Sequence, residues 1–266
     1  MLSNLHTHTT YCDGKDTPEA IVQYAIDRGF SSVGFSGHCR TDFDLRYCMK
    51  DPDTYLAHIR YLKEEYKDKI PIFIGIEEDT KALICRDDFD YIIGACHYVE
   101  IVGQNYPIDC DLEEMDRAIA AVGGDPIKFA ELYFQTFCEY IKVRKPDIVA
   151  HFDLITKYDE KMAPYFLGNP IYEEMSEKYM EEALKYDCIF EINSGAIARV
   201  LRTTPYPHER LLHCIKKRDG KMILSSDCHS ADKLDFYFEE MLALLRDVGF
   251  THVYHLTKDG FRKASI

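Results

Sequence analysis

One pattern recurs along most of the chain: a short run of β-branched or apolar residues is followed by a longer segment with helical spacing. This alternation is typical of α/β proteins with a parallel sheet. Seven such runs can be counted, and an eighth at 251–255 is weaker. The seven predicted strands are 4–6, 32–36, 70–76, 91–96, 148–151, 189–193 and 222–226.

Capping residues and apolar spacing predict the helices between these strands. Thr17-Pro18 and Asp125-Pro126 each place an N-cap residue before a proline at the first helical position, which predicts helices over 17–28 and 125–144. Apolar residues three and four apart predict further helices over 53–67, 172–186, 211–218 and 236–246. The stretches 39–52, 98–124 and 194–206 lack this spacing and are expected to be irregular loops after strand ends. No linker or repeat divides the chain, so one domain over residues 1–266 is expected.

Composition excludes several classes of protein. No apolar run approaches the roughly 18 residues that cross a bilayer, so no membrane association is expected. The formal net charge of -14 disfavours nucleic-acid binding, which depends on Lys and Arg. The ten cysteines form no C-x-x-C pair and accompany no export signal. We therefore expect reduced thiols and a cytoplasmic protein, whose oligomeric state the sequence leaves open.

Metal-ligand side chains gather at the ends of the predicted strands. His6 and His8 are two residues apart in an extended segment, so they point to the same side, and Asp227 and His229 repeat this spacing at the last strand. A parallel barrel brings its strand ends into one ring. Nine groups are therefore expected to converge: His6, His8, Asp13, His38, Glu77, His97, His151, Asp227 and His229.

Nine groups are too many for one tetrahedral ion. Two or three divalent ions, with Glu77 as a bridge, would account for them, and imidazole and carboxylate ligands suit zinc, iron or manganese. Such a cluster would attract a phosphate locally despite the acidic surface, and water shared by two ions would be acidic enough to form hydroxide that attacks phosphorus. A small phosphorylated substrate is therefore the expected partner.

These motifs resemble the PHP (polymerase and histidinol phosphatase) superfamily. They are H-T-H with Asp13, G-F-S-G-H at 34–38, G-I-E at 75–77, His97, A-H-F-D-L-I at 150–155, E-I-N-S at 191–194 and S-D-C-H at 226–229. The resemblance spans residues 4 to about 230 and is greatest to the histidinol-phosphate phosphatase branch. It implies a distorted seven-stranded (β/α) barrel, similar to a TIM barrel, with a trinuclear metal site that hydrolyses L-histidinol phosphate in histidine biosynthesis.

The resemblance also implies a division of the ligands. One ion would take His6, His8, Glu77 and Asp227, a second Glu77, His97 and His151, and a third Asp13, His38 and His229. Relatives often have Glu where this chain has Gly37, and the Ser-Gly-Ala-Ile-Ala-Arg stretch that follows Asn193 also departs from the pattern. Both departures lie in loops expected to face the substrate, so they bear on substrate identity.

Further roles can be assigned around the nine groups. Glu77, Asp227 and His229 are the expected catalytic residues, and Arg199 and Lys157 are expected to bind phosphate oxygens. Asp153 and Asn193 are candidates for orienting the imidazoles. Acidic residues in two loops could pair with the substrate ammonium or could be solvated: Asp42, Asp44, Asp109 and Asp111.

Other functions remain open at this point. A PHP-type phosphodiesterase or nuclease would need a basic groove, and the chain offers only short clusters such as Lys216-Lys217-Arg218. A general small-molecule phosphatase differs only in substrate range, and a non-enzymatic metal-binding domain would be expected to have lost ligands. The remaining histidines follow no ligand-bearing strand and are expected to lie outside the site: His58, His208, His213, His252 and His255.

Overall fold

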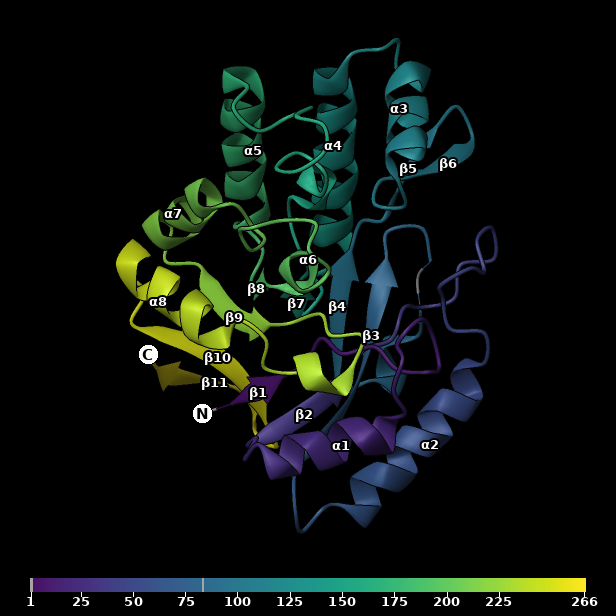
Figure 1. The fold of residues 1–266 in the computed structure, drawn as a ribbon, viewed down its shortest axis with the longest axis vertical. Coiled ribbons are helices and arrows are strands. Elements are labelled where there is room, and N and C mark those ends of the chain that lie inside the picture. The colour runs from purple at the N-terminus through teal and green to yellow at the C-terminus, as the bar shows by residue number, and fades with distance from the viewer. Residues whose placement is uncertain (1, 83) are drawn as a thin grey trace.

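A curved, nearly all-parallel sheet organises the computed structural model, which describes residues 2–82 and 84–266 (Figure 1). Each strand is parallel to its neighbours except the last, which pairs antiparallel to β10. The seven predicted strands are confirmed as β1 to β4 and β7 to β9, and the eighth is β10. In spatial order the nine strands are β1 (Ser3–Asn4), β2 (Ser32–Phe35), β3 (Ile72–Asp79), β4 (Tyr91–Ala95), β7 (Ile148–Val149), β8 (Ile189–Asn193), β9 (Lys221–Ser225), β10 (His252–Thr257) and β11 (Gly260–Ser265).

The segments that follow β1 and β9 meet and close the barrel at the carboxyl ends of its strands. Thr7 and Cys228 form a parallel bridge, in which the His8 amide donates to the Cys228 carbonyl at 2.9 Å. Seven strands from β1 to β9 therefore form the ring, as expected for a distorted (β/α) barrel. The β10–β11 hairpin continues the sheet beyond β9, where β10 pairs through Tyr254 and Ile223. β11 is an addition to the predicted strands.

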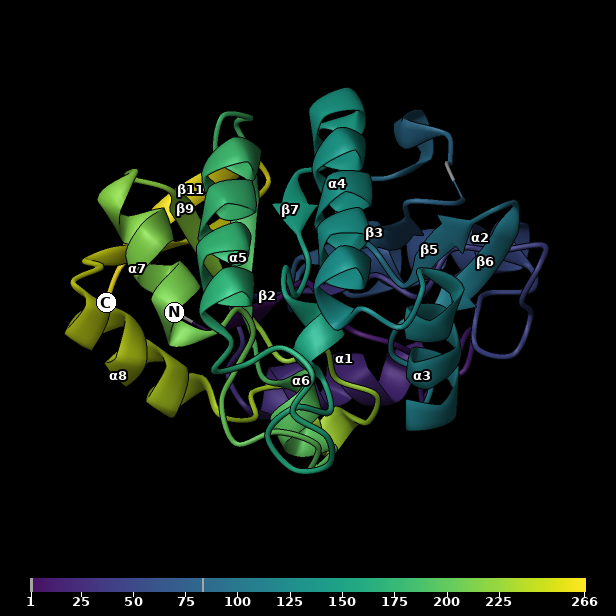
Figure 2. The ribbon, with the colours of Figure 1, turned by 90° about the horizontal axis from the view of Figure 1, so that it is seen from above.

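Helices cover the outside of this sheet (Figures 1 and 2). Thr17 and Asp125 accept backbone N–H bonds as N-caps of α1 and α4, as predicted. No helix in the described ranges is long and apolar enough to cross a membrane. The helices are α1 (Pro18–Asp27), α2 (Pro52–Glu65), α3 (Leu112–Ala121), α4 (Pro126–Arg144), α5 (Pro170–Ala183), α6 (Gly195–Ala198), α7 (Glu209–Lys217) and α8 (Phe238–Val248), with short 3-10 turns η1 (Arg86–Asp88), η2 (Leu154–Thr156) and η3 (Ala231–Lys233).

The expectation of an irregular loop over 98–124 is wrong. This stretch forms the antiparallel hairpin of β5 (Tyr98–Ile101) and β6 (Gln104–Pro107), followed by α3. Val102 and Gly103 both have positive φ, the backbone that a tight two-residue hairpin turn requires. Asp111 then caps α3 by accepting the Glu114 amide at 2.8 Å. The 194–206 loop likewise contains one short helix, α6, whereas 39–51 has no regular helix or strand.

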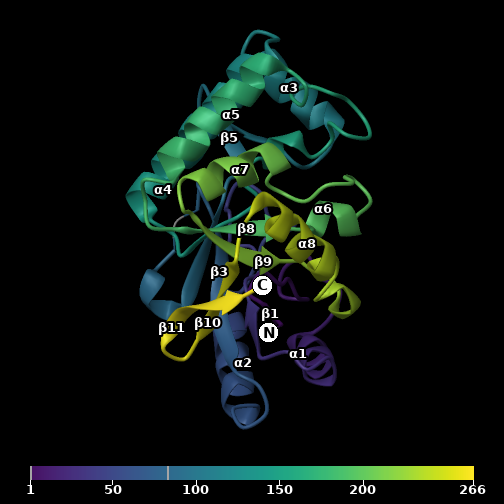
Figure 3. The ribbon, with the colours of Figure 1, turned by 90° about the vertical axis from the view of Figure 1, so that its left-hand side faces the viewer.

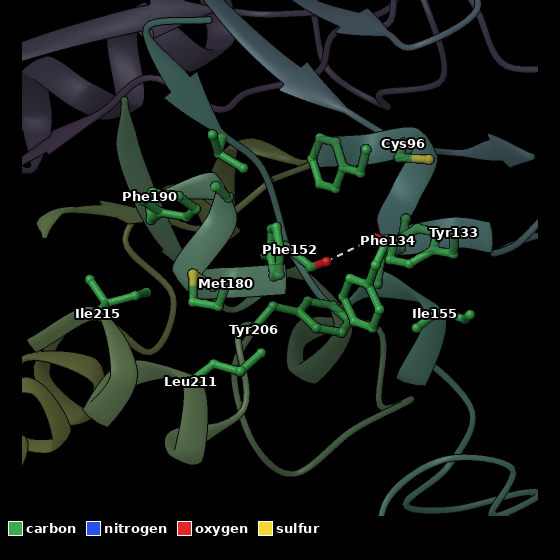
Figure 4. Packing of buried hydrophobic residues seen from close by; sticks show 14 of the residues in the cluster. Cys96, Tyr133, Phe134, Phe152, Ile155, Met180, Phe190, Tyr206, Leu211 and Ile215 are labelled. Atoms are coloured by element: carbon green, nitrogen blue, oxygen red, sulfur yellow. Dashed lines mark hydrogen bonds between the residues drawn. The ribbon is translucent and has the colours of Figure 1, made fainter. Parts of the chain in front are cut away.

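Buried aromatic residues fix the segment that carries one of the candidate ligands. Phe152, beside His151, packs against Phe134 of α4 with ring centroids 5.4 Å apart, and the Tyr133 hydroxyl donates to the Phe152 carbonyl at 3.0 Å (Figure 4). These residues belong to a large core between the sheet and helices α3 to α5, α7 and α8. Helices α1 and α2 lie at the opposite end of the molecule from α3 to α5 (Figure 3), and a second core packs beneath them. Helix packing therefore anchors the strand end at His151.

Phe134→Ala should destabilise the fold by about 3–5 kcal/mol, because it leaves a cavity in this core. Val143→Ala on the same helix is the control, since Val143 is exposed and its loss should change the free energy of unfolding by less than about 0.5 kcal/mol. Urea unfolding of both variants measures the two values. Equal stability of the two variants would contradict this description of the core.

Candidate metal centre and its cavity

The nine expected ligand groups converge at the carboxyl end of the barrel. Eight of them lie at or just after the ends of six strands, and Asp13 comes from the loop between β1 and α1. Closure of the ring brings the first pair of ligands, His6 and His8, beside the last pair, Asp227 and His229. Thr7 and Cys228, which form the closing bridge, are the residues in the middle of these two pairs. His8 Nε2 consequently lies 3.2 Å from Asp227 Oδ1, although 219 positions separate them in the numbering.

Glu77 occupies the middle of the group. It is almost fully buried, and its two carboxylate oxygens lie 2.7 to 3.6 Å from nitrogens of five imidazoles. The shortest distance, 2.7 Å, joins Glu77 Oε2 to His38 Nδ1. The five imidazoles are those of His6, His8, His38, His97 and His151.

Asp13 and Asp227 complete the other side of the group. His229 Nε2 lies 3.2 Å from Asp13 Oδ2, and its ring stacks on that of His8 with centroids 4.2 Å apart. His38 Nε2 is 3.7 Å from Asp13 Oδ1, so His38 lies between Asp13 and Glu77. The nine groups therefore form one continuous cluster.

Two observations indicate that the cluster suits metal ions. The buried Nε2 atoms of His6 and His8 make no hydrogen bond of good geometry within the described residues, although oxygens of Glu77 and Asp227 lie 3.2 to 3.7 Å away. Buried imidazole nitrogens are normally satisfied. Four sets of ligand atoms also lie within 4.8 Å of one another, which lets one ion reach a set at bond lengths of about 2 Å. The sets are His8, Asp13, His38 and His229; His6, His8 and Asp227; His6, Glu77 and His151; and His38, Glu77 and His97.

These sets agree only in part with the division of ligands among three ions that the family resemblance implies. His6, His8 and Asp227 fall together, as do Asp13, His38 and His229. Glu77 belongs to two sets, one with His151 and one with His97, which is the arrangement of a bridge. His38 can approach either Asp13 or Glu77, so the geometry allows more than one assignment of this imidazole.

The charges of the cluster keep its carboxylates ionised and divide its imidazoles. Burial opposes the charge of Glu77, but His38, His6 and His97 outweigh it and hold the pKa of this carboxyl well below its usual range. The pKa of Asp227 is held low against burial by Arg199 and His6. Burial, with His229 and His38 nearby, lowers the pKa of His8 to about 3. At neutral pH the carboxylates are ionised and His8 offers a neutral imidazole. The nearby carboxylates raise the pKa of His6, His38 and His97 against the effect of burial, so metal ions would displace protons from these rings.

Two carboxylates that the sequence reasoning missed orient the imidazoles. Glu191 Oε2 lies 2.9 Å from His6 Nδ1, while its other oxygen accepts the His151 amide at 2.9 Å. Asp79 Oδ2 lies 3.3 Å from His97 Nδ1. Each contact turns Nε2 of the ring toward Glu77. Alternation along the strands could have revealed both, because Asp79 is two residues from Glu77 and Glu191 is two from Asn193.

The expected orienting residues Asp153 and Asn193 have other partners. Asp153 accepts the backbone amide of His208 at 2.9 Å, and Asn193 donates its side-chain amide to Glu191 at 2.6 Å. Asn193 therefore acts one step further out, through Glu191. Asp153 instead fixes the start of α7, because its carboxylate accepts the amide of the N-cap residue His208.

Backbone geometry brings Asp227 into the cluster. Asp227 has φ +48°, a left-handed conformation that Asp tolerates better than most residues. Gly195 makes room for it, because a Cβ at residue 195 would stand 2.6 Å from Asp227 Oδ2. Ser194-Gly195, one of the departures noted in the sequence, therefore allows the α6 turn to approach this candidate ligand.

The cluster forms the floor of a cavity of about 460 Å³, a size that suits small molecules. Arg199 lines it, and its guanidinium donates to Asp227 Oδ2 at 3.1 Å and to His229 Nδ1 at 3.2 Å. Lys157 also lines it, but its ammonium lies 3.1 Å from Asp109 Oδ2. Of the two residues expected to bind phosphate, Arg199 contacts the cluster directly, whereas Lys157 contacts Asp109 outside it.

The four loop aspartates have different surroundings in the structure. Only Asp109 lines the cavity among them, and Lys157 helps to hold its pKa down at about 2 against the effect of burial. Asp44 is bound by Arg46, Asp42 is exposed beside Arg40, and Asp111 caps α3. The five histidines expected outside the site lie in none of the candidate metal sets formed by the described residues.

Comparison with known proteins supports the motif analysis. The model of the PHP domain family matches residues 4–195. A Schizosaccharomyces pombe protein named "Probable histidinol-phosphatase" is 27% identical over 261 residues, covering 90% of this chain and 84% of that protein. The histidinol-phosphatase of Bacillus subtilis is 23% identical over 264 residues, covering 89% of this chain and 97% of its own length.

A solved structure has the same fold. It is the histidinol phosphate phosphatase of Lactococcus lactis, which was crystallised with zinc, L-histidinol and phosphate, and it aligns with a TM-score of 0.70 at 19% identity. The alignment covers 98% of each chain. The family model spans more than half of the present chain and includes seven of its nine clustered groups. The chain therefore belongs to the PHP domain family.

Proposed function

We propose that this chain is a metal-dependent phosphomonoesterase that hydrolyses L-histidinol phosphate to L-histidinol and phosphate, a step of histidine biosynthesis. The observation that carries the proposal is Glu77, a buried carboxylate within 3.6 Å of five imidazoles at the floor of a small-molecule cavity. The names of the relatives and the ligands of the Lactococcus structure support this choice of substrate.

The proposed metal ligands are the nine clustered residues, with Glu77 as the bridge between two or three zinc, iron or manganese ions. The Nε2 atoms of His6 and His8, which make no hydrogen bond of good geometry within the described residues, support this assignment. Divalent ions held there would lower the pKa of water and neutralise phosphoryl oxygens, which is the chemistry that phosphate ester hydrolysis requires.

The chain's own residues would bind and orient the ester. Arg199 would use its remaining N–H groups for phosphoryl oxygens, because guanidinium matches phosphate geometry. His229 contacts both Asp13 and Arg199, so it would hold this guanidinium over the floor. Glu77 and Asp227, ionised at neutral pH, would balance the positive charge that gathers there. These contacts support catalytic roles for Glu77, Asp227 and His229, and Lys157 would bind phosphate only after leaving Asp109.

We also propose that residues 1–266 act as one PHP-type barrel domain in the cytoplasm. The continuous sheet from β1 to β11 supports one domain. All ten cysteines are free thiols, which fits a reducing compartment.

Phosphate release from a panel of esters tests the function. With metals bound, kcat/KM should be highest for L-histidinol phosphate, by about tenfold or more over a sugar phosphate, a nucleoside monophosphate and a phosphodiester. Chelation should abolish turnover, and added zinc or manganese should restore it. Equal rates on all monoesters would indicate a general phosphatase, and preference for the diester a phosphodiesterase. No turnover by the metal-loaded protein would contradict an enzymatic role.

Glu191→Gln should weaken metal binding by about 10- to 100-fold, because the variant loses the charge that orients the His6 ring. Glu174→Gln is the matched control, since Glu174 is exposed on α5. Competition with a chromogenic zinc chelator measures the affinity of each variant. Equal affinity of the Glu191 variant and the wild type would refute the orienting role of this carboxylate.

A further inference from the structure

The cavity has two unlike sides. Its floor consists of the clustered imidazoles and carboxylates, with Arg199 at one edge. Beyond His38 and His97 the lining includes the rings of Tyr47, Tyr98 and Pro107, next to the polar groups of Arg46, Asp109, Cys110 and Lys157. A phosphate ester whose phosphorus lies on the floor directs its alcohol part toward the walls, and the two tyrosine rings give one wall a flat face.

Tyr47 and Tyr98 form a stacked pair on this side. Their ring centroids are 6.2 Å apart with planes inclined by 22°. Tyr47 also meets the His38 ring edge-on, with centroids 4.7 Å apart and planes at 90°. Phe43 supports Tyr98 in the same way at 4.9 Å. The pair is therefore in direct contact with a candidate metal ligand and packed firmly against its neighbours.

The two hydroxyl groups differ in their partners. Tyr98 donates to Asp44 Oδ2 at 2.7 Å, and Arg46 holds the same carboxylate. The Tyr47 hydroxyl is buried near that of Tyr98 and makes no hydrogen bond of normal geometry with any described residue. A buried hydroxyl without a partner is costly, so a ligand group that could bond to it would bind favourably here.

Charge on this side is already balanced. Asp44 is paired with Arg46 and Asp109 with Lys157, so neither carboxylate is free for a substrate ammonium. The aromatic pair, by contrast, offers ring faces and one unsatisfied hydroxyl. A flat ring that carries nitrogen donors and acceptors fits both features.

We propose that Tyr47 and Tyr98 form the subsite for the imidazole ring of the substrate alcohol, with the Tyr47 hydroxyl bonded to a ring nitrogen. The inference rests on the proposed function and deepens it, because it assigns substrate choice to ring recognition instead of ammonium charge. Tyr47 supplies the specific contact, and Tyr98, fixed by Asp44, holds the Tyr47 ring in place.

Three phosphate esters separate these contributions. L-Histidinol phosphate carries the ammonium and the imidazole, L-phenylalaninol phosphate carries the ammonium and a ring without nitrogen, and phosphoethanolamine carries the ammonium alone. The metal-loaded wild type is compared with Tyr47→Leu, Tyr47→Phe and the control Tyr61→Leu, whose exposed tyrosine lies on α2. Metal content is measured for each variant, so a loss of ions is recognised separately from a change of preference.

Tyr47→Leu should reduce the preference in kcat/KM for L-histidinol phosphate over phosphoethanolamine by about tenfold, because the stacking face is lost. Tyr47→Phe should keep most of that preference but reduce the preference for imidazole over phenyl by roughly two- to tenfold, because only the hydroxyl is lost. Tyr61→Leu should match the wild type.

The outcomes test the aromatic subsite and the proposed function separately. If the wild type prefers L-histidinol phosphate and both Tyr47 variants keep the full preference, the subsite is wrong and the proposed function stands. If the wild type shows no preference for L-histidinol phosphate, the proposed function fails and the subsite with it. If Tyr47→Leu does not fold, the imidazole-to-phenyl ratio of Tyr47→Phe alone decides.

Discussion

The arrangement of the site depends on how the buried charge of Glu77 is compensated. An isolated charge in a protein interior is strongly unfavourable unless hydrogen bonds, opposite charges or metal ions compensate it. Glu77 is 1% exposed and faces five imidazoles and no Lys or Arg among its closest contacts in the described residues. The imidazoles compensate this charge by taking up protons, as the raised pKa values of His6 and His97 indicate, whereas divalent ions between them and the carboxylate would compensate it with the rings neutral.

Barrel closure makes this arrangement possible. The bridge between Thr7 and Cys228 joins the two ends of the ring and places His6 and His8 beside Asp227 and His229. The outer helices then support the strand ends: Tyr133 and Phe134 of α4 pack on Phe152 and thereby hold His151. Packing of the outer helices therefore holds a candidate metal ligand in position.

The strand ends and the nine groups could be predicted from the sequence. Alternation within each strand shows which side chains share a side, and a parallel sheet gathers its strand ends at one face. Alternation along the strands places Glu191 and Asp79 on the side of the site, but their role as partners of imidazoles was not assigned, because a carboxylate that supports a ring looks the same in sequence as one that binds a metal. Sequence reasoning also assigned Lys157 to phosphate without seeing that Asp109, 48 positions away, holds its ammonium. The β5–β6 hairpin was missed because its turn, Val102-Gly103, carries only one glycine as a signal. Pairings between distant loops depend on the folded shape, and Tyr47 with Tyr98 is another example.

The central claim is that Glu77 joins separate metal positions into one centre. Elemental analysis of the wild type, Glu77→Gln and the exposed control Glu65→Gln, each purified and loaded with zinc in the same way, tests it most directly. The account predicts two or three ions per chain in the wild type and in the control. It predicts that Glu77→Gln loses more than one ion, because a bridging charge is removed from two positions at once. A Glu77→Gln protein that keeps the full number of ions, or that loses one ion alone, would contradict the bridge.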